Sequence, residues 1–131
     1  MRHLSYYFIG VAAIQALVGM GVGIYMGIGG DFTLAPAHAH NNLLGWVSMA
    51  IFGLYYAVAP VVAAKRISAV HFWVALVANI IFPIGIGLAV TNQGPTVSIV
   101  GSLLEVLNML LFAIIVWTNR SALPSLDGRP S

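Results

Sequence analysis

Polar and apolar positions divide the chain into four long apolar runs separated by short polar stretches. About 20 mainly apolar residues are enough for a helix to cross a bilayer. The runs extend from about Tyr6 to Met26, Leu34 to Pro60, Ser68 to Val90 and Thr96 to Thr118. Because short loops make successive helices antiparallel neighbours, the pattern predicts an all-α protein. Its expected architecture is a four-transmembrane-helix up-down bundle, a single membrane domain over residues 1–131 with an irregular tail from Asn119.

Composition identifies the solvent of this domain. Hydrophobic residues make up 60% of the chain and charged residues only 6%, whereas a soluble domain carries roughly 25% charged residues. The expected partner of the apolar surface is therefore a lipid bilayer and not a nucleic acid. The chain contains no cysteine, which excludes disulfides, thiolate metal sites and cysteine nucleophiles.

The basic residues predict the orientation in the membrane. The second loop and the two ends contain all five of them, and the first and third loops contain none: Arg2, Lys65, Arg66, Arg120 and Arg129. Cytoplasmic loops of membrane proteins carry an excess of Lys and Arg. We therefore expect the N- and C-termini to be cytoplasmic, in a multi-pass protein of a bacterial-type inner (plasma) membrane.

Glycine and proline mark two places where helix packing departs from the average. The first run contains Gly19, Gly23 and Gly27 at intervals of four residues, a spacing that lets two helix backbones approach closely. It also occurs simply because glycine is common in membrane helices. Pro83 lies inside the third run and predicts a kink there.

Polar residues inside the membrane are expensive and need a reason. The candidates outside the second run are Gln15, Asn79, Glu105 and Asn108. Glu105 is either a neutral or hydrogen-bonded structural group, or a proton-relay group or an orienting partner of a metal-ligating histidine. His71 follows the basic loop closely, so it is expected at the cytoplasmic interface.

The stretch PAHAHNNLLGW, residues 36–46, opens the second run. Thr33 or Asp31 is expected to cap this helix, with Pro36 in its first turn. His38 and His40 are two residues apart, which turns a helix by about 200°. They are expected on nearly opposite faces, where they cannot chelate one ion together. Hydrated interfacial histidines are one interpretation, and ligands of haem iron, copper or zinc are the other.

The run AHAHNNLLGWVSMAIFGLYY, residues 37–56, resembles the histidine-bearing helix of haem–copper oxidase subunit I, in particular its nitric oxide reductase and cbb3-type branches. In that family one histidine of a His-x-His helix binds the high-spin haem and the other the low-spin haem. The resemblance implies iron of haem b as a cofactor, His38 and His40 as its ligands, and Asn41, Asn42 and Trp46 as surrounding residues.

The chain departs from that family in length and in its histidines. Subunit I has twelve spans in three arcs of four helices, so the resemblance implies a homotrimer of this four-span chain with sites between protomers. The chain has no His-His pair, so one protomer does not assemble the family's complete binuclear centre. The resemblance thus implies an electron-transfer or gas-binding haem protein with no assigned catalytic residue. A copper- or zinc-binding membrane protein and a non-catalytic membrane scaffold are the alternatives.

Overall fold

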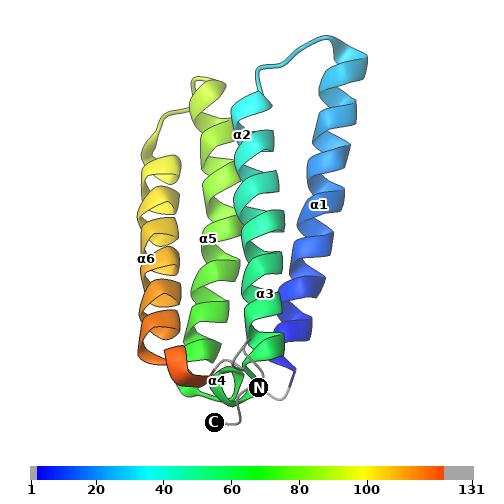
Figure 1. Ribbon diagram of the computed structural model, residues 1–131. Helices are drawn as coiled ribbons and strands as arrows, with labels where there is room; N and C mark the ends of the chain where they lie inside the picture. Colours follow the sequence, from blue (N-terminus) through cyan, green and yellow to red (C-terminus); the bar gives the residue numbers. More distant parts are fainter. Residues whose placement is uncertain (1–2, 123–131) are drawn as a thin grey trace.

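The computed structural model describes residues 3–122, and all regular structure in this range is helical. Four helical columns stand side by side and alternate in direction (Figure 1). Three columns are single helices, and the second column consists of three consecutive segments. The elements are α1 (Leu4–Gly29), α2 (Ala35–His40), the π-helix η1 (Asn41–Ser48), α3 (Met49–Val58), α4 (Pro60–Ala63), α5 (Arg66–Val90), α6 (Thr96–Thr118) and the 3₁₀ turn η2 (Arg120–Ala122).

The predicted all-α class is confirmed, and the helix bounds lie close to the predicted runs. The helices α1, α5 and α6 are each long and apolar enough to cross a membrane. The second column is shorter than predicted at its end, because the chain leaves the helix at Ala59 (φ −122°, ψ 63°). Pro60 follows, and proline disfavours a helical conformation in the residue before it. Pro60 then begins the short helix α4.

The helix α5 continues through Pro83, where the sequence predicts a kink. The helix α5 runs from Arg66 to Val90 with Pro83 inside it. Proline removes one backbone donor in a helix interior, and α5 accommodates this loss without ending.

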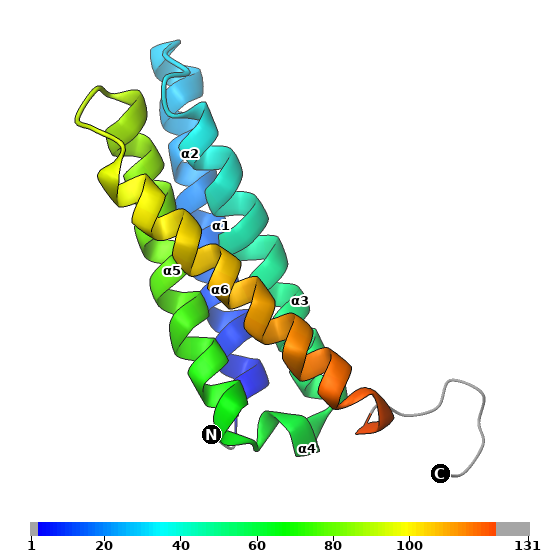
Figure 2. The same ribbon diagram turned by 90° about the vertical axis from the view of Figure 1, so that its left-hand side faces the viewer.

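Seen from the side of α6, the bundle has α6 in front, α5 and α3 behind it, and α1 at the back (Figure 2). The helix α6 packs along α5 and crosses it, so that its later turns also reach α3. There the Phe112 ring packs on Phe52 of α3, with ring centroids 4.5 Å apart. The helix α1 packs on the other side, against η1 and α3.

All Lys and Arg side chains of the described range gather at one end of the bundle: Lys65, Arg66 and Arg120. This end, the basic end, also holds the start of α1, α4 and the end of α6 (Figure 1). The Lys65 ammonium donates a hydrogen bond to the side-chain oxygen of Asn119 and so ties the start of α5 to the end of α6. Arg2 and Arg129 lie outside the described residues, as do residues 123–131 of the predicted tail.

The loop at the opposite end does not cap α2 as predicted. Leu34 precedes α2 and its side chain makes no capping bond. The Asp31 carboxylate instead accepts hydrogen bonds from the Thr33 hydroxyl (2.6 Å) and the Thr33 backbone N–H (2.9 Å). These two bonds stabilise the charged form and lower the pKa of Asp31 below its ordinary value. The predicted place of Pro36, in the first turn, is confirmed.

Large apolar side chains cover the outside of the columns. Ile28, Val61 and Trp117 are examples, and each exposes more than two thirds of its surface. Soluble monomers rarely expose contiguous apolar patches of this kind, whereas lipid tails are a suitable solvent for them. The exposed surface and the three membrane-length helices together indicate a membrane protein.

Two glycines, Gly85 and Gly101, bring the backbones of α5 and α6 close together. A Cβ atom at Gly101 of α6 would lie 2.6 Å from the Phe82 Cα of α5, and one at Gly85 of α5 would lie 2.4 Å from the Ser98 backbone nitrogen of α6. Small residues at such contacts allow van der Waals packing of the two backbones, which is a main source of helix association in lipid.

We therefore expect Gly101→Ala to destabilise the protein, although Ala normally favours a helix. The new methyl group meets backbone that cannot move aside, and overpacking of this kind costs about 1–3 kcal/mol. Gly21→Ala is the matched control, because a Cβ there has no neighbour within 4 Å. This substitution should raise the free energy of unfolding by roughly 0.5–1 kcal/mol, since Ala favours the helix over Gly. Reversible unfolding in detergent measures both, and equal signs for the two substitutions would contradict the packing assigned to Gly101.

Candidate functional site

The histidine pair lies where the second column changes its helical form. The α-helical turn α2 ends at His40, and the π-helix η1 begins at Asn41. The Asn41 backbone N–H contacts the carbonyls of both Ala37 and His38 at this junction. The Ser48 hydroxyl donates to the Leu43 carbonyl (3.0 Å) near the other end of η1. Wide π-helical turns inside α-helices occur frequently at functional sites, and nothing in the sequence pattern predicted this one.

His38 faces α1, where two glycines make room for it. Its Nδ1 lies 2.9 Å from the Gly19 carbonyl oxygen, and Asn42 Nδ2 lies 3.1 Å from its Nε2. A Cβ at Gly19 would lie 2.0 Å from Asn42 Oδ1, and one at Gly23 would lie 3.1 Å from His38 Cε1. The Gly19-x-x-x-Gly23 spacing thus receives two polar side chains from the second column. At Gly27 a Cβ would have no neighbour within 4 Å.

His40 points away from α1. Its ring packs edge-on against Phe82 of α5, with centroids 5.2 Å apart, and its Nδ1 lies 2.8 Å from the Pro36 carbonyl oxygen. The side chain is half-buried. The predicted placement of His38 and His40 on different faces of the helix is therefore what the structure shows.

Both imidazoles are held in the same tautomer. A carbonyl oxygen only accepts hydrogen bonds, so Nδ1 of each neutral ring carries the hydrogen and Nε2 carries the lone pair. In His38 this lone pair faces the Asn42 amide. In His40 no hydrogen bond to Nε2 occurs within the described range. A backbone carbonyl on Nδ1 is the usual arrangement that orients a metal-ligating histidine.

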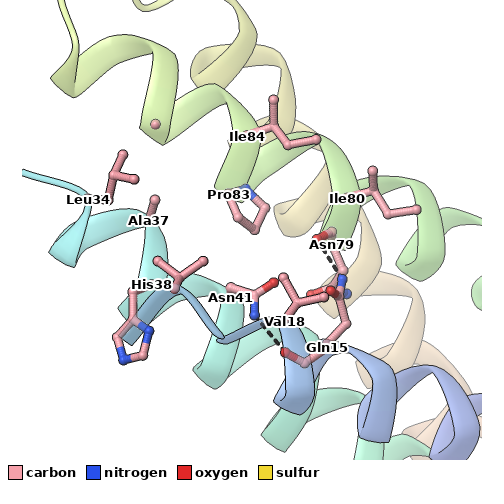
Figure 3. A pocket seen from close by; sticks show the side chains of 12 residues that line it. Gln15, Val18, Leu34, Ala37, His38, Asn41, Asn79, Ile80, Pro83 and Ile84 are labelled. Carbon is pink, nitrogen blue, oxygen red and sulfur yellow. Dashed lines mark hydrogen bonds between the residues drawn. The ribbon is translucent and has the colours of Figure 1, made fainter. Parts of the chain in front are cut away.

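Asn41 lies inside the bundle and not beside the histidine rings. Its side-chain amide donates to the Gln15 carbonyl (2.9 Å), and the Gln15 side-chain amide donates to the Asn79 carbonyl (3.1 Å). Figure 3 shows both bonds, which link the second column, α1 and α5. These two bonds satisfy groups that would otherwise be costly in an apolar interior.

A cavity of ≈ 310 Å³ lies next to these bonds. His38 and Asn41 are at its wall, opposite Pro83 and Ile84 of α5, and the His38 ring is turned away from those two side chains (Figure 3). Most of its lining is apolar: Val18, Val22, Leu34, Ala37, Ile80, Pro83, Ile84 and Gly87. The volume is at the lower end of ordinary ligand pockets, about 300 Å³.

The five residues predicted for the site are not gathered in one pocket. His38 and Asn42 form a pair against α1, and Asn41 lies buried behind them. His40 stands on the other side of the column, and Trp46 exposes 44% of its surface to the outside. The described residues also contain no group of three or more His, Asp and Glu side chains placed to hold a metal ion.

A second polar cluster lies inside the bundle around His71, which the sequence predicts at the depth of the cytoplasmic interface. The His71 side chain is fully buried between the helices. The Tyr56 hydroxyl lies 2.8 Å from its Nδ1, and aromatic rings surround it, among them Phe52 at 4.8 Å and Phe8 at 5.2 Å between centroids. Position along the chain predicts only the depth of His71, whereas the rotation of α5 turns its side chain inward.

Glu105 and Asn108 continue this cluster on α6. The Asn108 amide donates to Glu105 Oε2 (3.0 Å), and both side chains are buried. The interpretation of Glu105 as bonded to an amide within the bundle is confirmed by this contact.

With this geometry the chain belongs to the class of helical membrane proteins with polar groups inside the bundle. Comparison with protein-family models, with curated proteins and with solved structures finds no match to any of them.

Proposed function

We propose that the protein is a four-span, homotrimeric membrane protein that binds haem b through His40 and His38, in electron transfer or gas binding. One observation carries this proposal: both imidazoles are fixed through Nδ1 to backbone carbonyls, at 2.8 and 2.9 Å. That arrangement presents Nε2 as the nitrogen available to iron. The resemblance of residues 37–56 to haem-ligating helices points to the same two side chains.

The donor set favours haem over a bare copper or zinc ion. A zinc ion requires three or four protein ligands, and the described part of one protomer offers no such group. A porphyrin brings its own equatorial nitrogens, so one or two histidines are enough to hold its iron. Bare copper or zinc would need histidines from several protomers around a symmetry axis.

His40 is the stronger ligand of the two. Its Nε2 has no hydrogen bond within the described range, and the side chain lies at the outer surface of the protomer next to Phe82. His38 must first release the Asn42 amide from its Nε2. A surface ligand of this kind fits a site shared with a neighbouring protomer. Haem would supply redox-active iron, with electron transfer favoured by two histidine ligands and gas binding by one.

The topology rests on the second column and on charge. The segments α2, η1 and α3 follow one another without a break between residues 35 and 58 and run parallel to the three membrane-length helices (Figure 1). We take this column as the fourth span. The gathering of Lys65, Arg66 and Arg120 at one end supports a cytoplasmic basic end with both termini in the cytoplasm of a bacterial-type cell.

Absorption spectra of the purified protein test the proposal. Protein expressed with ample haem supply is expected to show a Soret band that changes on reduction with dithionite. Metal analysis of the same sample separates the alternatives. If the protein shows no Soret band but retains copper or zinc, the haem proposal is wrong and the site binds a bare metal ion. If it contains neither haem nor metal, the scaffold alternative is supported.

A further inference from the structure

The interior between the basic end and the centre of the bundle holds several polar atoms without hydrogen-bond partners. The described residues include five buried side-chain atoms that make no hydrogen bond: Tyr55 Oη, His71 Nε2, Asn79 Oδ1, Glu105 Oε1 and Asn108 Oδ1. Each unpaired group in an apolar interior costs free energy. Groups of this kind point to water molecules or protons that the side chains exchange.

Three of these side chains, those of His71, Asn108 and Glu105, form a line together with Tyr56. The Tyr56 hydroxyl contacts His71 Nδ1 at 2.8 Å, and the His71 ring stacks on Phe112 of α6, with centroids 5.6 Å apart, one helical turn from Asn108. The Asn108 amide in turn contacts Glu105 Oε2 at 3.0 Å. His71 Nε2 and Asn108 Oδ1 are both buried and both lack a hydrogen-bond partner among the described residues, so we place a bridging water between them.

The line begins at a second cavity. This cavity, ≈ 480 Å³ in volume, lies at the basic end, and Tyr56 is part of its wall. The other lining residues come from the start of α1 and from α4 and its flanks: His3, Leu4, Ser5, Tyr6, Ala57, Pro60, Ala63 and Ala64. Tyr56 is the residue that both lines the cavity and bonds to His71.

Glu105 ends the line without a counter-charge. The sequence places no Lys or Arg between Arg66 and Arg120, so no cation of α5 or α6 pairs with this buried carboxyl group inside the membrane. The titratable groups nearby are His71 from α5 and Tyr55 and Tyr56 from α3. A buried carboxylate without a cation is strongly unfavourable, which leaves the protonated acid as the resting form.

We propose that Tyr56, His71, Asn108 and Glu105 form a proton relay between the cavity at the basic end and the centre of the bundle. In the outward direction Glu105 gives its proton to water that the Asn108 side-chain oxygen holds, and this water passes a proton to His71 Nε2. His71 gives the proton on Nδ1 to the Tyr56 oxygen, and Tyr56 releases its own hydroxyl proton to the cavity. Glu105 is left as a carboxylate, His71 and Tyr56 each gain and lose one proton, Asn108 only holds the water, and the reverse sequence reloads the acid. The relay uses none of the haem-binding residues, so it is independent of the proposed function.

Infrared spectroscopy of the full-length protein tests the relay, because Glu105 is the only glutamate in the chain. In an ester-free detergent at neutral pH, a carboxylic acid C=O band is expected in the wild type and absent in Glu105→Gln. Transfer into D₂O shifts this band as the proton exchanges. Tyr56→Phe and His71→Phe are expected to slow the shift by roughly a hundredfold, the lower end of what a positioned proton-transfer side chain contributes.

Tyr6→Phe is the matched control, since Tyr6 is an exposed tyrosine that lines the same cavity. In this variant the Glu105 band should shift in D₂O at the same rate as in the wild type. Thermal melts followed by circular dichroism establish that each variant is folded. Tyr56→Phe removes one hydroxyl group only, so it decides the question if His71→Phe fails to fold. A wild type without the acid band, or an unchanged exchange rate in Tyr56→Phe, would overturn the proposal.

Discussion

At the proposed haem site, His40→Ala is expected to abolish haem binding. The His40 ring is fixed by the Pro36 carbonyl and by edge-on contact with Phe82, and its Nε2 is the nitrogen without a partner in the described range. Loss of a group that merely orients a ligand lowers metal affinity about 10–100-fold. Loss of the ligand itself should lower the affinity for haem by more than roughly 100-fold, so the Soret band should fall below detection.

Two further histidine variants make this result specific. His3→Ala is the control, because His3 is exposed and its side chain does not cap α1, so its haem content should equal that of the wild type. His38→Ala should have the smaller effect of the two ligand variants, since His38 Nε2 faces Asn42. A His40→Ala protein with a full haem content and an unchanged spectrum would remove His40 from the site.

Phe8→Ala is expected to have the largest effect on stability. The Phe8 ring is fully buried, and its centroid lies 5.1 to 5.9 Å from those of Phe72, His71, Tyr56 and Phe52. Removal of the ring leaves a cavity among three columns of the bundle. Phe→Ala in a packed core costs about 3–5 kcal/mol. In lipid the substitution removes packing contacts but changes the transfer free energy little, because lipid tails are as apolar as the ring. We therefore expect the free energy of unfolding to fall by about 3 kcal/mol, the lower end of this range.

Leu17→Ala provides the comparison for this prediction. Leu17 lies on the same helix and exposes 68% of its surface, so its truncation removes lipid contacts and leaves no internal cavity. Its effect on the free energy of unfolding should stay within about 0.5 kcal/mol. If Phe8→Ala and Leu17→Ala were equally mild in reversible unfolding, the aromatic cluster would not be the packed core of the bundle.

The helices could be predicted with good accuracy because their signal is local. Length and hydropathy placed α6 at Thr96–Thr118, as the structure has it. The errors occurred at the helix ends, where single backbone groups decide at which residue a helix begins. Leu34 precedes α2, where Asp31 or Thr33 was expected as the cap. Ala59 leaves the helix because Pro60 follows it.

Candidate site residues could be identified by type but not located. The two-residue spacing correctly placed His38 and His40 on different faces. It did not show that Gly19 and Gly23 would receive Asn42 and His38, because that contact joins residues far apart in the chain. Helical rotation also decided that His71 faces inward, and a sequence without a strong amphipathic pattern carries little information on rotation.

The sequence by itself therefore determined the solvent, the number and approximate bounds of the apolar runs, and the gathering of positive charge, because each depends on residues counted locally. Only the tertiary structure decided which polar groups meet. The contacts of His38 with Gly19, and of Tyr56 with His71, depend on how the columns rotate and how closely they approach. In lipid that choice is made by close packing and by the need of buried polar groups for partners, and both act between residues distant in sequence.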